Sequence, residues 1–190
     1  KLTQYLREKD LIEYPDIEKN PSLALSVKYS HPEWLVKKWI KNYGLEETEK
    51  IFEFNNLTPE LTIRINTLLI DKEKLKELFR ENKIDFSENP LSKDCLNINH
   101  QGKVPDLVGF KEGYWLIQGI SSCIVSEVLA PEENENILDA CSAPGSKTAH
   151  IASLMKNKGQ ITALDISAKR IEKITQNCKR LGISCVKTIQ

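Results

Sequence analysis

The 190-residue sequence lacks the features that usually mark a membrane, secreted or metal-binding protein. No apolar run approaches the roughly 20 residues that a membrane-spanning helix needs, and the opening Lys-Leu-Thr-Gln shows no apolar signal core. The five cysteines are an odd number without any C-x-x-C pair, which argues against a disulfide framework and against a zinc site. We therefore expect a reduced, cytoplasmic protein without a metal ion or a membrane partner.

Two common nucleotide-binding signatures are also missing. The sequence contains no G-x-G-x-x-G fingerprint, and no glycine lies upstream of Gly145 in the register of a P-loop. NAD and a nucleoside triphosphate are therefore disfavoured as ligands. The composition, with 40% hydrophobic and 28% charged residues, is that of an ordinary globular protein of one or two domains.

The net charge is zero, but the charges are unevenly distributed along the chain. Residues 137–190 hold nine basic and three acidic side chains, whereas the rest of the chain is acidic on balance. This asymmetry favours contact between the C-terminal region and a polyanion or an anionic ligand, with solvated helix faces as the alternative.

The N-terminal part of the chain is predicted to be helical. We expect a helix over 1–14, a linker over 15–29 because it contains two prolines, and another helix over 46–55. Ser30 and Glu33 have the spacing of a capping box, which predicts that Ser30 is the N-cap of a helix that continues through the apolar residues after Glu33.

A small α+β unit is predicted next. Residues 61–66 alternate apolar and polar side chains, which indicates a half-buried strand. Asp71 is placed to cap the following helix, and residues 84–110 read as short strands and loops. The predicted fold therefore begins with a small helical and α+β module.

The C-terminal part changes to an alternation of strands and helices, after a helix predicted over 117–128. Such an alternation predicts parallel pairing with right-handed crossovers, so we expect an α/β fold containing the first half of a Rossmann-like sheet with three parallel strands. The predicted elements are strands at 136–140, 160–165 and 183–188, and helices at 146–155 and 167–181.

The most informative stretch, residues 138–148, leads from the first of these strands into a helix. In open α/β sheets, ligands bind at this carboxyl end of the strands. Small residues let the backbone approach a ligand, and Gly145 can adopt angles that other residues avoid. The free N–H groups of the helix start suit a carboxylate or phosphate, and Lys147 adds a positive charge.

Asp165 ends the second predicted strand, 20 residues beyond Gly145. An acid at this position is placed to accept hydrogen bonds from the two hydroxyls of a ribose, although it could instead cap the next helix. A ribose together with a carboxylate-bearing tail and without phosphates describes S-adenosylmethionine.

The run Asp139-x-Cys141-x-Ala143-Pro144-Gly145-x-Lys147-Thr148 resembles motif I of the RNA cytosine-C5 methyltransferases of the NOL1/NOP2/Sun class. The resemblance extends over nearly the whole chain, through Tyr29-Ser30-His31-Pro32-x-Trp34 upstream and Asp165-x-Ser167-x-x-Arg170 downstream. It is strongest toward the bacterial members that methylate a cytosine of small-subunit ribosomal RNA.

The resemblance implies roles for particular residues. The methionine end of the cofactor would be held by residues 141–147, and its ribose by Asp165. The residues of this cofactor loop are Cys141, Ser142, Ala143, Pro144, Gly145, Ser146 and Lys147.

The resemblance also implies a domain layout and a partner, which is ribosomal RNA. Residues 1–28 would be the tail of a preceding NusB-like helical domain with a linker, 29–115 an RNA-binding α+β subdomain, and 116–190 the N-terminal half of a Rossmann-like cofactor domain.

Candidate RNA-contacting residues are Arg64, Asn66 and Arg170, with an ordinary solvent-exposed surface as the alternative. Trp34 and Trp39 are expected to lie in the hydrophobic core.

Two departures from the family pattern stand out. Ser146 replaces the second glycine of motif I, which a helix start tolerates. More importantly, the family reaction needs a Cys after Thr as nucleophile and a Cys after Pro for product release, and neither pair occurs here. The five cysteines are each expected to be small buried hydrophobes, so no catalytic residue is assigned and the nucleophile is expected beyond residue 190.

The chain is thus interpreted as a fragment of an S-adenosylmethionine-dependent RNA cytosine-C5 methyltransferase. The alternatives are a non-catalytic RNA-binding module and a methyltransferase that acts on another substrate. We also expect the outer edge of the first parallel strand to favour self-association or to be covered, because bare apolar strand edges aggregate.

Overall fold

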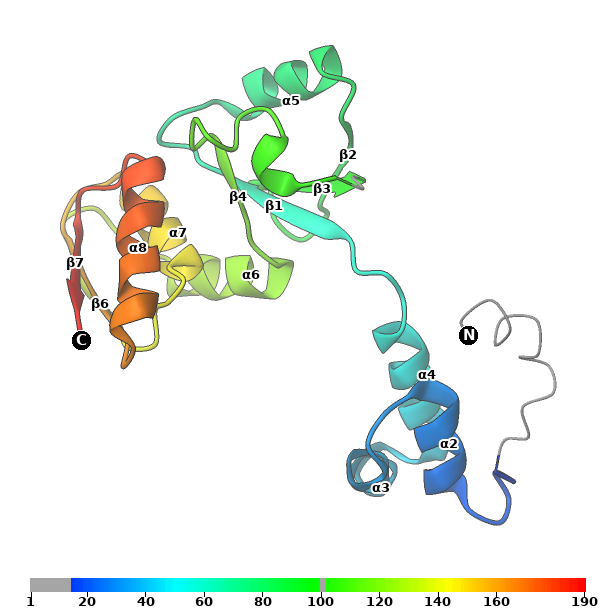
Figure 1. Ribbon diagram of the computed structural model, residues 1–190. Coiled ribbons are helices and arrows are strands. Elements are labelled where there is room, and N and C mark those ends of the chain that lie inside the picture. The colour runs from blue at the N-terminus through cyan, green and yellow to red at the C-terminus, as the bar shows by residue number, and fades with distance from the viewer. Residues whose placement is uncertain (1–14, 100–101) are drawn as a thin grey trace. The chain divides into compact units, whose positions relative to one another are not determined.

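The computed structural model describes residues 15–99 and 102–190, and the helix predicted over 1–14 lies outside them (Figure 1). The chain divides into two units, Lys1–Pro59 and Glu60–Gln190. The first is helical and the second contains both sheets.

The first unit packs three helices, α2 (Pro21–Tyr29), α3 (Glu33–Tyr43) and α4 (Leu45–Asn55), around a small apolar core. The linker prediction is wrong over α2. This helix starts where it does because the Asn20 side chain accepts a hydrogen bond from the Leu23 N–H at 3.2 Å, and Pro21 fits a first turn that needs no N–H donor.

The predicted capping box is also wrong. Ser30 does not start α3 but ends α2 in the left-handed conformation, and Pro32 precedes α3 without a side-chain cap. The Glu33 carboxylate instead accepts a hydrogen bond from Ser22 Oγ at 3.0 Å, which ties α3 to α2.

The two tryptophans of α3 differ in their surroundings. Trp39 packs against Phe52 with 5.3 Å between the ring centroids, in accordance with the prediction of a core residue. Trp34 is 67% exposed, so its prediction as a core residue is wrong. Trp34 lies two positions before Val36, the buried residue of α3, and so falls on the opposite side of the helix.

The second unit begins with a four-stranded antiparallel sheet in the order β2-β3-β1-β4. Its apolar core includes Ile63, Ile65, Phe79, Leu96 and Trp115. The elements of this sheet and its connections are β1 (Leu61–Ile65), α5 (Lys72–Glu81), β2 (Asp85–Glu88), β3 (Cys95–Asn99), the 3₁₀ turn η2 (Val104–Asp106) and β4 (Trp115–Ile117).

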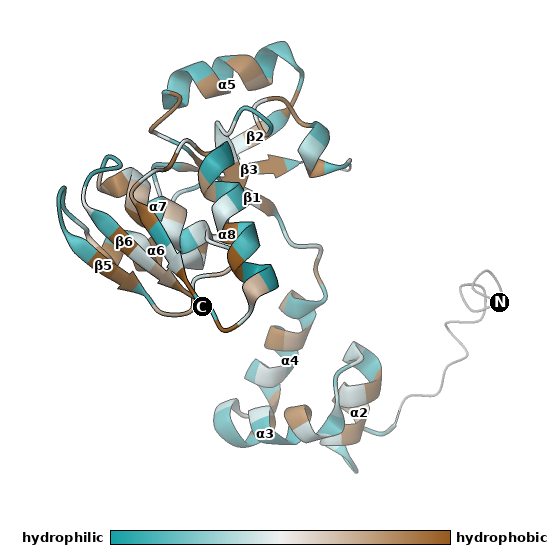
Figure 2. Cartoon of the chain, turned by 60° about the vertical axis from the view of Figure 1, so that its left-hand side comes forward, coloured by the Kyte–Doolittle hydropathy of each residue, from teal (hydrophilic) through white to brown (hydrophobic). Residues whose placement is uncertain are grey.

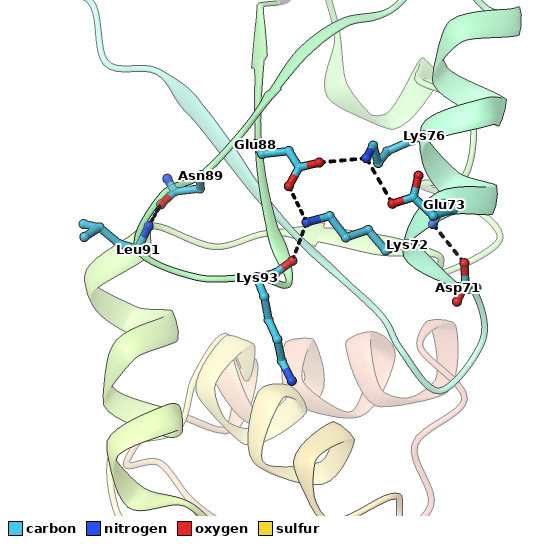
Figure 3. Close-up of polar contacts among 8 residues, drawn as sticks. All are labelled: Asp71, Lys72, Glu73, Lys76, Glu88, Asn89, Leu91 and Lys93. Atoms are coloured by element: carbon cyan, nitrogen blue, oxygen red, sulfur yellow. Dashed lines mark hydrogen bonds and ion pairs between the residues drawn. The ribbon is translucent and has the colours of Figure 1, made fainter.

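Polar contacts at one end of this sheet hold α5 against β2 (Figure 3). Asp71 caps α5 as predicted, because its side chain accepts from the Glu73 N–H at 2.9 Å. Lys72 and Lys76 both reach the Glu88 carboxylate, at 2.8 and 2.7 Å, and lower the pKa of Glu88 to about 2.

The rest of the second unit is a parallel sheet, which confirms the predicted fold class. The strands β5 (Asn136–Asp139), β6 (Gln160–Leu164) and β7 (Val186–Ile189) pair side by side in parallel, with Ile137 opposite Ile161. The connecting helices are α6 (Ile120–Leu129), α7 (Ser146–Leu154) and α8 (Ala168–Arg180). Figure 2 shows the apolar stretch of β5 in brown.

Two boundaries differ from the prediction. Ile117 belongs to β4, where it pairs with Ile63, so the helix predicted from 117 begins only at Ile120. Apolar periodicity spanned both elements because β4 runs into α6 after only two residues. β7 starts at Val186, three residues later than predicted.

β5 pairs only with β6 among the described residues, and its Leu138 side chain is 62% exposed. Self-association through this edge stays a prediction. Within the described chain, every helix is too short or too polar to cross a membrane. The same residues bring together no group of three His, Cys, Asp or Glu side chains that could hold a metal ion.

Candidate cofactor site

The loop between β5 and α7 leaves the start of α7 open. Gly145 precedes α7 in the left-handed conformation at φ +95°, and its N–H donates to Ser142 O at 2.7 Å. In the described part of the chain, no side chain caps this helix. The N–H groups of its first turn therefore present a partial positive charge that suits an anion.

The loop is held against the end of β6. Both the N–H and the hydroxyl of Ser142 donate to Leu164 O, at 2.9 and 2.7 Å. The Ala143 N–H donates to Asp165 Oδ2 at 3.3 Å. These bonds place the loop and the Asp165 carboxylate side by side at the carboxyl ends of β5 and β6.

Helix α8 holds the loop from its other side. Arg170 donates to Ala143 O at 3.0 Å, and Asn177 donates to Pro144 O at 2.8 Å. A Cβ on Gly145 would lie 3.2 Å from Ile174 Cγ2, so only glycine lets the loop approach α8 this closely. Sequence reasoning did not assign Asn177 to the loop, although its spacing of seven from Arg170 puts both residues on one helix face.

Asp165 is a buried carboxylate with three donors. Besides Ala143, the Ser167 N–H donates to its Oδ1 at 3.1 Å, and the Arg170 guanidinium lies 3.4 Å from the same atom. The Arg170 side chain is about half exposed, whereas that of Asp165 is almost fully covered. A carboxylate offers about four acceptor positions, so these three donors leave one of them unused.

The structure brings together all eight residues that were predicted from the sequence to bind the cofactor. Ser142, Ala143 and Gly145 are buried in the loop, Ser146 is partly exposed, and three side chains at the rim are exposed. These three are Cys141, Pro144 and Lys147. Asp139, at the end of β5, accepts from the Thr148 hydroxyl at 2.7 Å and so fixes the first turn of α7 to the sheet.

Two of the candidate RNA-contacting residues have internal partners. Arg64 is 1% exposed, and its Nε donates to Gln118 Oε1 at 2.9 Å. Asn66, also buried, donates to Gly113 O and Leu181 O at 2.9 Å each. Both side chains thus join β1 to later parts of the chain, which favours a structural role over the exposed surface that the alternation of β1 suggested.

The cysteines differ from one another more than the sequence indicated. Cys95, Cys123 and Cys178 are buried as predicted, but Cys141 is exposed on the loop. Burial raises the pKa of the Cys178 thiol to about 11. The sequence around Cys95 shows no charge pattern that would lower the pKa of its thiol, yet the fold places Arg64 directly opposite Cys95 across the β1–β3 pair.

A parallel sheet, a small-residue loop at the first helix and a carboxylate at the end of the second strand define a class of protein. This class is the Rossmann-like methyltransferases that use S-adenosylmethionine, and the uncapped start of α7 beside Asp165 fits that cofactor.

Comparisons with known proteins narrow the class. The family profile described as 16S rRNA methyltransferase RsmB/F matches residues 126–190, and the profile of the ferredoxin-like domain of RsmF/B-like methyltransferases matches residues 31–105. The chain belongs to the RsmB/F family of ribosomal RNA methyltransferases.

Individual relatives agree with this placement. A protein of Bacillus subtilis named "Probable ribosomal RNA small subunit methyltransferase B" is 37% identical over 90% of this chain and 38% of its own length. A 28S rRNA (cytosine-C(5))-methyltransferase of Mus musculus is 34% identical over 84% of this chain and 20% of its own. The chain therefore spans about two fifths or less of these relatives.

Solved structures show the same fold. The crystal structure of PH0851 superimposes with a TM-score of 0.84 at 32% identity, over 95% of this chain and 41% of that one. The structure of NSun6 from Pyrococcus horikoshii with SFG has a TM-score of 0.75 at 22% identity, over 81% of this chain and 64% of that one.

Proposed function

We propose that the protein containing this chain methylates C5 of a cytosine in RNA, in the small-subunit ribosomal RNA, with S-adenosylmethionine as methyl donor. The observation that carries the proposal is the uncapped start of α7 beside the Asp165 carboxylate, within a chain of the RsmB/F family. When bound, the cofactor supplies a methyl group on a positively charged sulfur.

The loop residues would orient the cofactor. The free N–H groups at Ser146 and Lys147 point toward where a carboxylate can bind, and the exposed Lys147 ammonium adds a favourable charge. Asp165 would accept hydrogen bonds from the ribose hydroxyls. Since Arg170 lies 3.4 Å from Asp165 and is half exposed, its guanidinium can move into solvent and give way to a ribose hydroxyl, while the Ala143 and Ser167 N–H groups continue to donate to the carboxylate.

The nucleophile that activates the cytosine is proposed to lie outside these 190 residues. None of the five cysteines follows a Thr or a Pro, and the relatives are more than twice as long as this chain. Cys141, the exposed thiol of the loop, lies where the cofactor would bind and therefore is not proposed as the nucleophile.

RNA contact is proposed for the exposed face of α3. Trp34 and three lysines recur there at helical spacing and are all exposed, so an indole and several positive charges share one surface. Aromatic rings stack on unpaired bases and lysines neutralise phosphates, so the surface suits single-stranded RNA. The three lysines are Lys37, Lys38 and Lys41. Of these, Lys37 also forms an ion pair with Glu33.

The enzymatic proposal is tested by methyl transfer. The full-length protein is incubated with labelled S-adenosylmethionine and unmodified 16S ribosomal RNA, and the nucleosides are separated after digestion. Label in 5-methylcytidine is the expected result. Cofactor binding without transfer would favour the non-catalytic alternative, and label in another nucleoside would contradict the cytosine assignment.

The RNA surface is tested by binding. Trp34→Ala should weaken binding to a single-stranded ribosomal RNA segment about 10-fold, since a stacked base contributes roughly 1–3 kcal/mol. Lys38→Gln combined with Lys41→Gln should reduce the salt dependence of binding. The matched control is Lys50→Gln on α4, whose lysine pairs with Glu46 and Glu47 and should leave affinity unchanged. Equal affinities for all variants would contradict this surface.

A further inference from the structure

The interior of the second unit contains a positive charge without a carboxylate partner. The Arg64 guanidinium donates to Gln118 Oε1 at 2.9 Å, Ile65 O at 3.2 Å and Ser153 Oγ at 3.4 Å, all of them neutral. No carboxylate of the described residues forms an ion pair with it. Buried charges in proteins are normally paired, so a group that can become negative is expected nearby.

Two thiols occupy that neighbourhood. Cys95, the first residue of β3, lies opposite Arg64 in the β1–β3 register, and Cys123 lies on α6. Their Sγ atoms are 3.1 Å apart, and both residues are fully buried. The two thiols are within hydrogen-bond distance, with the Cys95 S–H donating to Cys123, and an ionised Cys95 would instead accept from the Cys123 S–H.

The charges around the pair favour ionisation of one thiol. The hydrogen bond with Cys123 has the largest effect, and together with a hydrogen bond to Ser92 and the Arg64 charge it lowers the pKa of the Cys95 thiol despite its burial. The pKa of Cys123 is raised by the same bond and by burial. Glu127 on α6 opposes ionisation, and Asp94 lies close enough to act on Arg64.

From α7, the buried His150 ring adds no charge to this neighbourhood. Burial and the proximity of Arg64 hold its pKa at about 3, so the ring is neutral near pH 7.

We propose that Cys95 and Cys123 form an oxidation site in which a small peroxide converts the two thiols into a disulfide, with Arg64 as the counter-charge of the reactive thiolate. This assignment is independent of the proposed methyl transfer. The link would join β3 of the antiparallel sheet to α6, the helix that leads into β5.

The reaction balances with hydrogen peroxide as oxidant. The Cys95 thiolate attacks one oxygen, the O–O bond breaks, and the departing hydroxide becomes water with the proton that Cys95 had released. Cys123 then attacks the sulfenic acid on Cys95, an S–S bond forms, the S–O bond breaks, and the hydroxide leaves as water with the Cys123 proton. Two thiols are oxidised, one peroxide is reduced and two waters result.

The experiment compares this pair with the other buried thiol of the same unit. The purified protein is treated with hydrogen peroxide near pH 7.5, denatured, alkylated and mapped by mass spectrometry. We expect a Cys95–Cys123 cross-linked peptide at doses that leave Cys178 fully reduced. In the untreated protein, Cys95 should be alkylated several-fold faster than Cys178, because the contacts of Cys95 favour its thiolate whereas burial raises the pKa of the Cys178 thiol.

Two variants separate reactivity from folding. Cys123→Ser removes the resolving thiol, so Cys95 should accumulate as a sulfenic acid that dimedone captures. Cys95→Ser should leave Cys123 reduced at the same peroxide dose. A peptide map without the cross-link, or a Cys95 alkylation rate equal to that of Cys178, would overturn the proposal.

Discussion

Two buried charges of the second unit, Asp165 and Arg64, differ in what surrounds them. Asp165 lies at the carboxyl end of β6, where two backbone N–H groups and the half-exposed Arg170 donate to it. Arg64 lies in the interior of β1, and its hydrogen-bond acceptors within residues 15–99 and 102–190 are all neutral.

We call Asp165 the binding position, because a ligand can reach its carboxylate, and Arg64 the joining position, because its hydrogen bonds connect β1 to other elements. At the end of β6 a partner such as Arg170 can move into solvent and give way to a ligand. Around Arg64 the partners are buried, and two neighbouring groups, Gln118 Nε2 and the His150 ring nitrogens, have no hydrogen-bond partner among the described residues. Such a cluster ties β1 to Gln118, just before α6, and to Ser153 on α7, and its cost in stability is high.

The first prediction removes the charge at the binding position. Asp165→Asn should weaken S-adenosylmethionine binding about 100-fold, since a hydrogen bond to a charged group contributes roughly 1.5–3 kcal/mol. Calorimetric titration measures the effect, and Glu172→Gln on α8 serves as the control because Glu172 bonds only the neighbouring Gln176. Unchanged affinity in Asp165→Asn would remove the distinction between the two positions.

The second prediction uses pH to probe the joining position. Buried His150 has no hydrogen-bond partner among the described residues, and its pKa falls from 6.5 to about 3. The unfolded chain therefore binds a proton that the folded chain excludes. The stability that neutral His150 provides is present above pH 6.5 and is lost as the pH falls toward 3, by about 1.4 kcal/mol per pH unit.

His150→Phe isolates this contribution. Urea unfolding between pH 7 and pH 5 should show about 2 kcal/mol more loss in the wild type than in the variant. Parallel curves for the two proteins would mean that the His150 ring is protonated in the folded state.

The third prediction concerns the loop backbone. Gly145→Ala should weaken cofactor binding about 10-fold, because a left-handed residue with a Cβ is strained by roughly 1–2 kcal/mol and this Cβ also meets Ile174 at 3.2 Å. Gly44→Ala is the matched control, since Gly44 has φ +81° but nothing within 4 Å of its Cβ. Equal cofactor affinities of the two variants would show that the loop tolerates the contact.

Much of the parallel half could be predicted from the sequence. The first strand, the small-residue loop and Asp165 lie within residues 136–165, and the later strand and helix follow directly, so local patterns are sufficient to order them. The adjacency of the loop to Asp165 follows from parallel pairing of β5 with β6.

The remaining features depend on contacts between distant residues. Arg64 meets Ser153, 89 positions away, and Asn66 meets Leu181, so an alternating strand that looked half exposed is buried on both faces. The Cys95–Cys123 pair spans 28 positions and has no sequence pattern. The exposure of Trp34 likewise depends on how α3 is rotated about its axis against α2 and α4. Apolar spacing predicts which residues share a face of the helix, but it does not fix that rotation to better than about one residue.

A crystal structure of the protein with S-adenosylmethionine bound tests the central claim most directly. The account predicts the carboxylate of the cofactor within hydrogen-bond distance of the N–H groups at Ser146 and Lys147, and a ribose hydroxyl on Asp165. Density for the cofactor at any other place, with Arg170 still on Asp165, would contradict it.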